Sequence, residues 1–77
     1  MRNNNNNIQQ VIDALLHPKY RWRTVSGIVK ETKMSEKEVR EYLEILMKKN
    51  KARKSYVSDP DGNDLYGLIL RVDGVEV

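Results

Sequence analysis

The segment SEKEVREYLEILMKK, residues 35–49, has the charge spacing of one helix face. When each residue advances the helix by 100°, the arc opposite the apolar positions holds Lys37, Glu38, Arg40, Glu41, Glu44, Ile45 and Lys48. Ammonium and guanidinium groups at this spacing could bind an anionic ligand. The same residues also form opposite-charge pairs at i,i+4, such as Lys37 with Glu41 and Arg40 with Glu44, worth about 0.2–0.5 kcal/mol each. The pattern therefore fits either a ligand-binding face or a solvated helix.

Basic residues are concentrated in the middle of the chain. Residues 19–54 hold twelve Lys or Arg and five Asp or Glu, whereas residues 55–77 hold one and five. Because neutralised phosphates supply most of the non-specific affinity of nucleic-acid binders, the basic middle favours a nucleic-acid partner. The acidic end contributes Asp59, Asp61 and Asp64, which a phosphate backbone would repel.

The composition disfavours several other classes of function. The 77 residues include no Cys, and His17 is the only His, so zinc would lack its about four ligands. No Ser/His/Asp or Cys/His set and no glycine-rich phosphate loop is evident, and we expect neither an enzyme nor a cofactor. No run approaches the about 20 apolar residues of a membrane span, and the N-terminus has no signal pattern. We therefore expect a cytoplasmic protein.

The first helix follows a polar N-terminal segment. MRNNNNN, residues 1–7, is of low complexity, and we expect a disordered tail in which Asn7 is available as a helix N-cap. Apolar residues at i, i+3, i+4 and i+7 then predict an amphipathic helix over residues 8–16, which ends before Pro18.

The segment YRWRT, residues 20–24, is predicted to be a short extended stretch. Its last residue, Thr24, can cap a second helix. We expect Trp22 to anchor the core, because a single Trp in a small chain is more often buried than free to stack on a base. Arg21 and Arg23 alternate with Trp22 and are expected to face solvent.

The third helix has the clearest local signals. Ser35 and Glu38 have the spacing of a capping box, in which each side chain binds the other residue's backbone N–H. Asn50 suits the left-handed position that follows a helix end. The apolar stripe that we expect to face the core comprises Val39, Tyr42, Leu43, Leu46 and Met47.

Two β-prone runs follow the third helix. ARKSYVS, residues 52–58, and DLYGLIL, residues 64–70, are separated by the turn sequence DPDGN. Proline and Asp-Gly in a short connection between β-prone runs predict a β-hairpin.

The order helix, strand, helix, helix, strand, strand, with WRTVSGIVKETKMSEKEVREYLEILMKKN as a helix-turn-helix core, resembles the winged helix-turn-helix family of DNA-binding domains. The resemblance covers residues 8–71 and leaves 72–77 as a C-terminal tail. It implies a small α+β fold, a three-helix core with a C-terminal β-hairpin wing. The chain departs from the family at Lys33, where glycine is common, and at Lys51 and Ala52, where two larger apolar residues are common.

The resemblance implies binding of double-stranded DNA, by a transcriptional regulator or part of one. The third helix would enter the major groove, the wing would touch the backbone or an adjacent groove, and the second helix would begin at a phosphate. Arginine can bind guanine through two hydrogen bonds, and glutamate can accept from cytosine N4. The implied base-reading residues are Lys37, Arg40, Glu41 and Glu44. The implied backbone and wing contacts are Thr24, Ser26, Arg53, Lys54, Tyr56 and Asn63.

Ile45 supports an alternative function. It lies about 130° from the centre of the core stripe, on the exposed side of the third helix beside Glu38. An exposed isoleucine among mixed charges could belong to a protein-docking or dimerisation surface, on a winged helix that does not bind DNA. A single exposed apolar residue is also normal on a protein surface, and an Ile45 without a binding role is the more common case.

Overall fold

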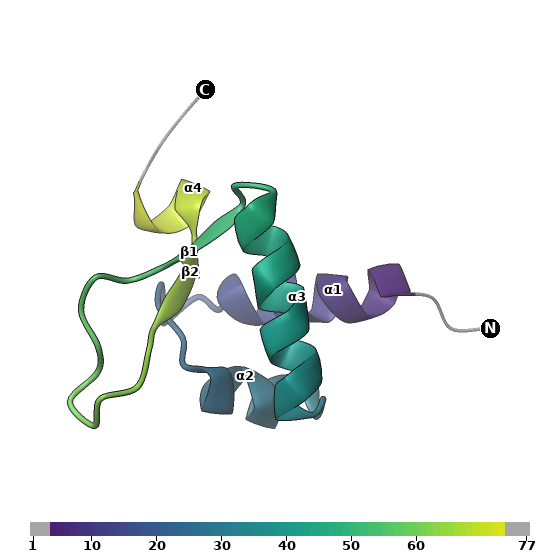
Figure 1. Cartoon of the computed structure of the whole chain (residues 1–77), viewed down its shortest axis with the longest axis horizontal. Coiled ribbons are helices and arrows are strands. Elements are labelled where there is room, and N and C mark those ends of the chain that lie inside the picture. Colours follow the sequence, from purple (N-terminus) through teal and green to yellow (C-terminus); the bar gives the residue numbers. More distant parts are fainter. Residues whose placement is uncertain (1–3, 74–77) are drawn as a thin grey trace.

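Helices enclose the core, and a hairpin closes one side of it. The structure is a computed structural model that describes residues 4–73. Its elements are α1 (Asn4–Leu15), α2 (Val25–Thr32), α3 (Glu36–Lys48), β1 (Ala52–Lys54), β2 (Tyr66–Leu68) and α4 (Ile69–Val72). The two strands pair antiparallel. Figure 1 shows α3 crossing in front of α1, the hairpin beside α3, and the connection between the strands extending away from the helices. The expected α+β fold with three helices and a hairpin is confirmed.

The predicted helix starts are confirmed at α2 and α3. Thr24 Oγ1 accepts a hydrogen bond from the backbone N–H of Gly27 at 3.0 Å. Ser35 Oγ accepts from the Glu38 N–H at 3.1 Å, and Glu38 Oε1 accepts from the Ser35 N–H at 3.2 Å. Both caps satisfy N–H groups that a helix start leaves without partners.

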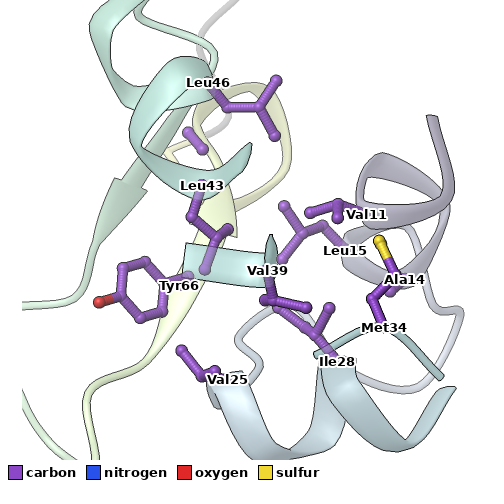
Figure 2. Packing of buried hydrophobic residues seen from close by; sticks show 11 residues of the cluster. Val11, Ala14, Leu15, Val25, Ile28, Met34, Val39, Leu43, Leu46 and Tyr66 are labelled. Carbon is purple, nitrogen blue, oxygen red and sulfur yellow. The ribbon is translucent and has the colours of Figure 1, made fainter. Parts of the chain in front are cut away.

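The core lies where α1, α2, α3 and the hairpin meet (Figure 2). The predicted stripe of α3 faces it, with Tyr42 and Met47 at its edges. The buried residues are Val11, Ala14, Leu15, Val25, Ile28, Met34, Val39, Leu43, Leu46, Ala52 and Tyr66. The small side chain of Ala52 is therefore part of the core, and the ring of Tyr66 fills the space beside α3.

Within residues 4–73, two residues other than glycine adopt left-handed backbone conformations. Asn50 follows α3 with a φ of 61°, as predicted. Lys33 ends α2 with a φ of 64°, at the position where the winged-helix family often has glycine. A side chain in this region costs roughly 1–2 kcal/mol, which glycine avoids.

The N-terminal helix begins earlier than predicted. α1 starts at Asn4, so Asn7 lies inside the helix and the prediction that it is the N-cap is wrong. The amide Nδ2 of Asn7 instead donates to the hydroxyl of Tyr42 on α3, at 3.4 Å. This contact joins two helices that are far apart in the sequence, so the composition of residues 1–7 could not predict it. Residues 1–3 of the expected tail lie outside the described residues.

The extended segment before α2 forms a single bridge to β2, in which Arg23 and Tyr66 exchange two backbone hydrogen bonds of 2.8 Å. The expectation that Arg23 faces solvent is wrong. Its guanidinium turns inward, where Nη1 donates to the Ala14 carbonyl and to the Glu31 carboxylate, each at 2.8 Å. Trp22 is only partly buried, and Tyr66 is the aromatic residue in the core. Arg23 therefore links α1, α2 and β2.

The strands are shorter than predicted, and a helical turn, α4, replaces the end of the second one. Arg71 of α4 fixes this turn, because its Nη1 donates to the carbonyls of Leu15 at 3.0 Å and His17 at 2.7 Å, at the end of α1. Gly67 permits close packing here, since a Cβ on it would lie 2.7 Å from the Arg21 carbonyl oxygen. Of the expected tail at residues 72–77, Val72 belongs to α4, and residues 74–77 lie outside the described residues.

Candidate nucleic-acid interface

The outer face of α3 carries the residues that the sequence suggested as base readers. Lys37, Arg40, Glu41 and Glu44 are all exposed. Together with Glu36 they line one depression on the surface of the helix. The structure therefore brings the four predicted residues together in a single surface.

Arg40 pairs with a different carboxylate from the one expected. Its Nη2 lies 2.8 Å from Glu36 Oε2, and its Nε donates to the same oxygen at 2.9 Å. Glu36 precedes Arg40 by one helical turn, which is the favourable order for an acid and a base on a helix. Both side chains remain more than half exposed, so this pair contributes little to stability and a ligand can replace it.

The electrostatic surroundings of Arg40 connect α3 to the wing. The hydrogen bond to Glu36 raises the pKa of Arg40 above its ordinary value, and the nearby Glu36, Tyr66 and Asp64 raise it further. Tyr66 belongs to β2, and its hydroxyl points away from the buried side chains in Figure 2. The outer face of α3 adjoins the hairpin, because α3 packs against β1.

Lys54 extends this surface on β1. It lies opposite Tyr66 in the strand register, so both side chains are on the same face of the hairpin. The Nζ of Lys54 is 3.5 Å from Asp64 Oδ2, and both side chains are about half exposed. Lys54 is therefore a cation at the edge of the α3 face, paired with a carboxylate of the wing.

Arg53 lies on the opposite face of the hairpin, because side chains alternate along a strand. Its guanidinium binds Asp73 through Nη2 at 2.7 Å and through Nε at 3.0 Å, and its Nη1 donates to the Lys54 carbonyl at 3.2 Å. The rings of Trp22 and Tyr56 lie 5.1 and 5.0 Å from its Cζ. All three nitrogens are engaged, and the structure does not bring Arg53 together with the α3 residues.

The remaining wing candidates sit in the connection between the strands. Tyr56 is 94% exposed. Asn63 is occupied within the loop, where its backbone N–H and its Nδ2 donate to Asp59 at 2.8 and 3.2 Å. These hydrogen bonds, led by the backbone one from Asn63, lower the pKa of Asp59. Gly62 completes the turn with a φ of 87°. Asn63 therefore stabilises the loop, and Tyr56 is the wing candidate that projects into solvent.

The start of α2 offers one free hydroxyl. Thr24 is partly buried and its side chain already accepts from the Gly27 N–H, whereas Ser26 is exposed in the first turn. Helix N-termini attract anions through their N–H groups. Ser26 is therefore the residue of this pair that remains available to a phosphate.

The alternative docking residues are exposed but not equivalent. The side chain of Ile45 is 39% exposed and therefore partly covered by its neighbours. Glu38 forms the capping box with Ser35. Glu38 thus has a structural role already, which leaves Ile45 as the docking candidate.

Sequence reasoning missed the part played by Asp64, Asp73 and Arg71. Asp64 was expected only to repel phosphate, yet it pairs with Lys54. Asp73 lies twenty positions from Arg53 in the sequence, and Arg71 lies fifty-six positions from Leu15, so no local pattern links them. Side chains alternate between the two faces of a strand. Because Ala52 is buried, this alternation could have indicated that the next residue, Arg53, faces away from the core.

The arrangement of the elements is that of a winged helix. A solved structure of similar fold is the Zalpha domain from Carassius auratus PKZ, crystallised in complex with Z-DNA. It matches with a TM-score of 0.65 and 19% sequence identity, over 83% of this chain and 94% of that chain. No family model and no curated protein matches the sequence. The likeness confirms the winged-helix fold that the sequence resembled.

Within residues 4–73, no group of three or more His, Cys, Asp or Glu is placed to hold a metal ion. None of the helices in this part of the chain is both long enough and apolar enough to cross a membrane.

Proposed function

We propose that this domain binds double-stranded DNA through the outer face of α3 and the adjoining edge of the wing, as a cytoplasmic transcriptional regulator or part of one. Lys37, Arg40 and Lys54 supply the cations of this surface. The basic middle of the chain supports the proposal, because all three residues belong to it. The Zalpha domain of similar fold was crystallised with Z-DNA. By analogy of fold, this supports a nucleic-acid ligand for the present domain.

One observation carries the proposal. Lys37 and Arg40 line one depression on the exposed face of α3, and α3 packs against β1, the strand that carries Lys54. A helix in the major groove needs its reading residues beside a wing that can reach the backbone, and Lys54 is in that position.

Binding would replace internal ion pairs with contacts to DNA. The exposed pair of Arg40 with Glu36 is worth about 0–1 kcal/mol, so exchange of this partner is not prohibitive. A guanine edge, which accepts two hydrogen bonds from arginine, would be worth about 1–3 kcal/mol of discrimination. Glu41 and Glu44 supply acceptors that suit amino groups of cytosine or adenine.

The experiment is a titration of the domain with labelled duplexes at two salt concentrations, read by fluorescence anisotropy. One duplex has mixed sequence and B form, and the other is a CG repeat held in the Z form. Salt-dependent binding of either supports the proposal, and the preferred duplex defines the helical form. Absence of binding to both at about 50 mM salt would reject it, since electrostatic affinity is strongest there.

The exposure of Ile45 favours one second function, a protein-docking surface on α3. In that case Ile45→Glu should abolish association with a partner or with a second copy. It should change the free energy of unfolding by no more than about 0.5 kcal/mol, as surface substitutions do. Sedimentation of both proteins tests self-association, and an unchanged distribution would leave Ile45 without support in that role.

A further inference from the structure

We infer that Asp64 is a specificity-determining residue, which weakens binding to arbitrary duplexes by holding Lys54 and opposing the approach of a phosphate to it. This inference rests on the proposed function and concerns the same surface. Asp64 lies in the connection between the strands, two positions before Tyr66, the first residue of β2. Its carboxylate lies beside Lys54 of β1.

The contact with Lys54 is direct. Lys54 Nζ and Asp64 Oδ2 are 3.5 Å apart, and each side chain is about half exposed. A phosphate that approaches Lys54 must therefore displace the carboxylate or accept its repulsion. A phosphate in contact with Lys54 would lie within the Debye length of about 10 Å at 0.1 M salt from Asp64, so salt would screen this repulsion only in part.

Asp64 also acts on Arg40 of α3, but more weakly than Glu36 does. The side-chain hydrogen bond to Glu36 is the main cause that raises the pKa of Arg40, and the charge of Asp64 is a smaller one. The guanidinium of Arg40 is bound directly to the carboxylate of Glu36. A ligand that offers only phosphate loses these attractions when it binds, whereas a base edge that hydrogen-bonds Arg40 compensates for them.

Other acids of the wing do not share this position. The carboxylate of Asp59 accepts hydrogen bonds from the backbone N–H groups of Asp61 and Asn63, which keeps the loop in shape. Asp61 is exposed and forms no ion pair within residues 4–73. Asp61→Asn therefore removes the same charge from the same loop without freeing Lys54, which makes it the matched control.

The test compares the wild type, Asp64→Asn and Asp61→Asn for binding to one mixed-sequence duplex by fluorescence anisotropy. We expect Asp64→Asn to bind about three- to tenfold more tightly at about 50 mM salt, with a smaller gain at about 200 mM because salt screens the repulsion. Asp61→Asn should change the affinity by less than about twofold.

A double-substitution cycle separates the local effect from general charge. In a Lys54→Gln background, the gain from Asp64→Asn should shrink by at least about half, because the cation that it frees is absent. An undiminished gain in that background, or equal gains from Asp64→Asn and Asp61→Asn, would overturn the inference. Salt-dependent binding of the wild type with no gain in Asp64→Asn would overturn it while the proposed function stands. Failure of every variant to bind would reject the proposed function itself.

Discussion

Arg53 and Asp73 form a two-point ion pair that fastens α4 to β1, with Arg53 Nη2 2.7 Å from Asp73 Oδ1 and Arg53 Nε 3.0 Å from Asp73 Oδ2. The hydrogen bond from Arg53 lowers the pKa of Asp73, and the charge of Arg53 lowers it further. Because the pKa is lower in the folded state, the pair stabilises the fold above about pH 4 and this contribution is lost as the pH falls through the lowered pKa.

Asp73→Asn should therefore lower the Tm at pH 7, and the difference from the wild type should disappear in acid below the lowered pKa of Asp73. Thermal unfolding followed by circular dichroism from about pH 7 to pH 2 measures both effects. Asp61→Asn is the control for loss of one carboxylate. Equal Tm values for Asp73→Asn and the wild type at pH 7 would show that the pair does not hold α4.

Leu43→Ala should lower the free energy of unfolding by about 2–5 kcal/mol, because Leu43 is 1% exposed in the middle of the core. Its neighbour Glu44 is exposed, and Glu44→Ala should change stability by no more than about 0.5 kcal/mol. Denaturant unfolding can be followed through Trp22, the single Trp of the chain. Similar losses in the two variants would mean that the face of α3 is assigned wrongly.

Ser35→Ala should cost about 1 kcal/mol, since Ser35 Oγ accepts the Glu38 N–H at the start of α3. Ser58→Ala, at an exposed position of the wing, provides a comparison with little expected change. Chemical unfolding of both variants measures the difference. If the two substitutions were equally mild, α3 would not depend on this cap.

Gly67→Ala should destabilise the fold by about 1–3 kcal/mol through overpacking. A Cβ at this position would lie 2.5 Å from Val72 Cγ1 and 2.7 Å from the backbone oxygen of Arg21. The backbone atom cannot move without disturbing the bridge between Arg23 and Tyr66. A Tm for Gly67→Ala equal to that of the wild type would show that α4 and the segment before α2 pack less closely against β2.

The contrast between α3 and the end of the chain explains what the sequence could predict. The capping box of Ser35 and Glu38, the stripe around Leu43 and the left-handed Asn50 depend on residues within a few positions of one another, so their pattern predicts α3 correctly. α4 depends instead on Arg71 reaching the end of α1 and on Asp73 reaching Arg53, contacts that only the folded chain creates.

The same distinction applies to the candidate interface. The spacing of Lys37, Arg40, Glu41 and Glu44 places them on one face of a helix, and the structure has them there. Spacing alone does not separate Glu36 from Glu44 as partners of Arg40, since both lie four positions away, but the order does, because an acid that precedes a base by one turn is favoured. The pairing of Lys54 with Asp64 depends on the conformation of the long connection between the strands. The sequence does not predict that conformation, so it does not predict the pair.

The salt dependence of duplex binding by the wild type and by Lys54→Ala tests the central claim most directly. The slope of log K against log salt should be clearly negative for the wild type, and Lys54→Ala should make it shallower by about 0.9, the value for one lost phosphate contact. Arg53→Ala should leave the slope unchanged, because Arg53 faces the other side of the hairpin and is bound to Asp73. A wild type without salt-dependent binding at about 50 mM salt would contradict the account, as would an Arg53→Ala variant that lost more slope than Lys54→Ala.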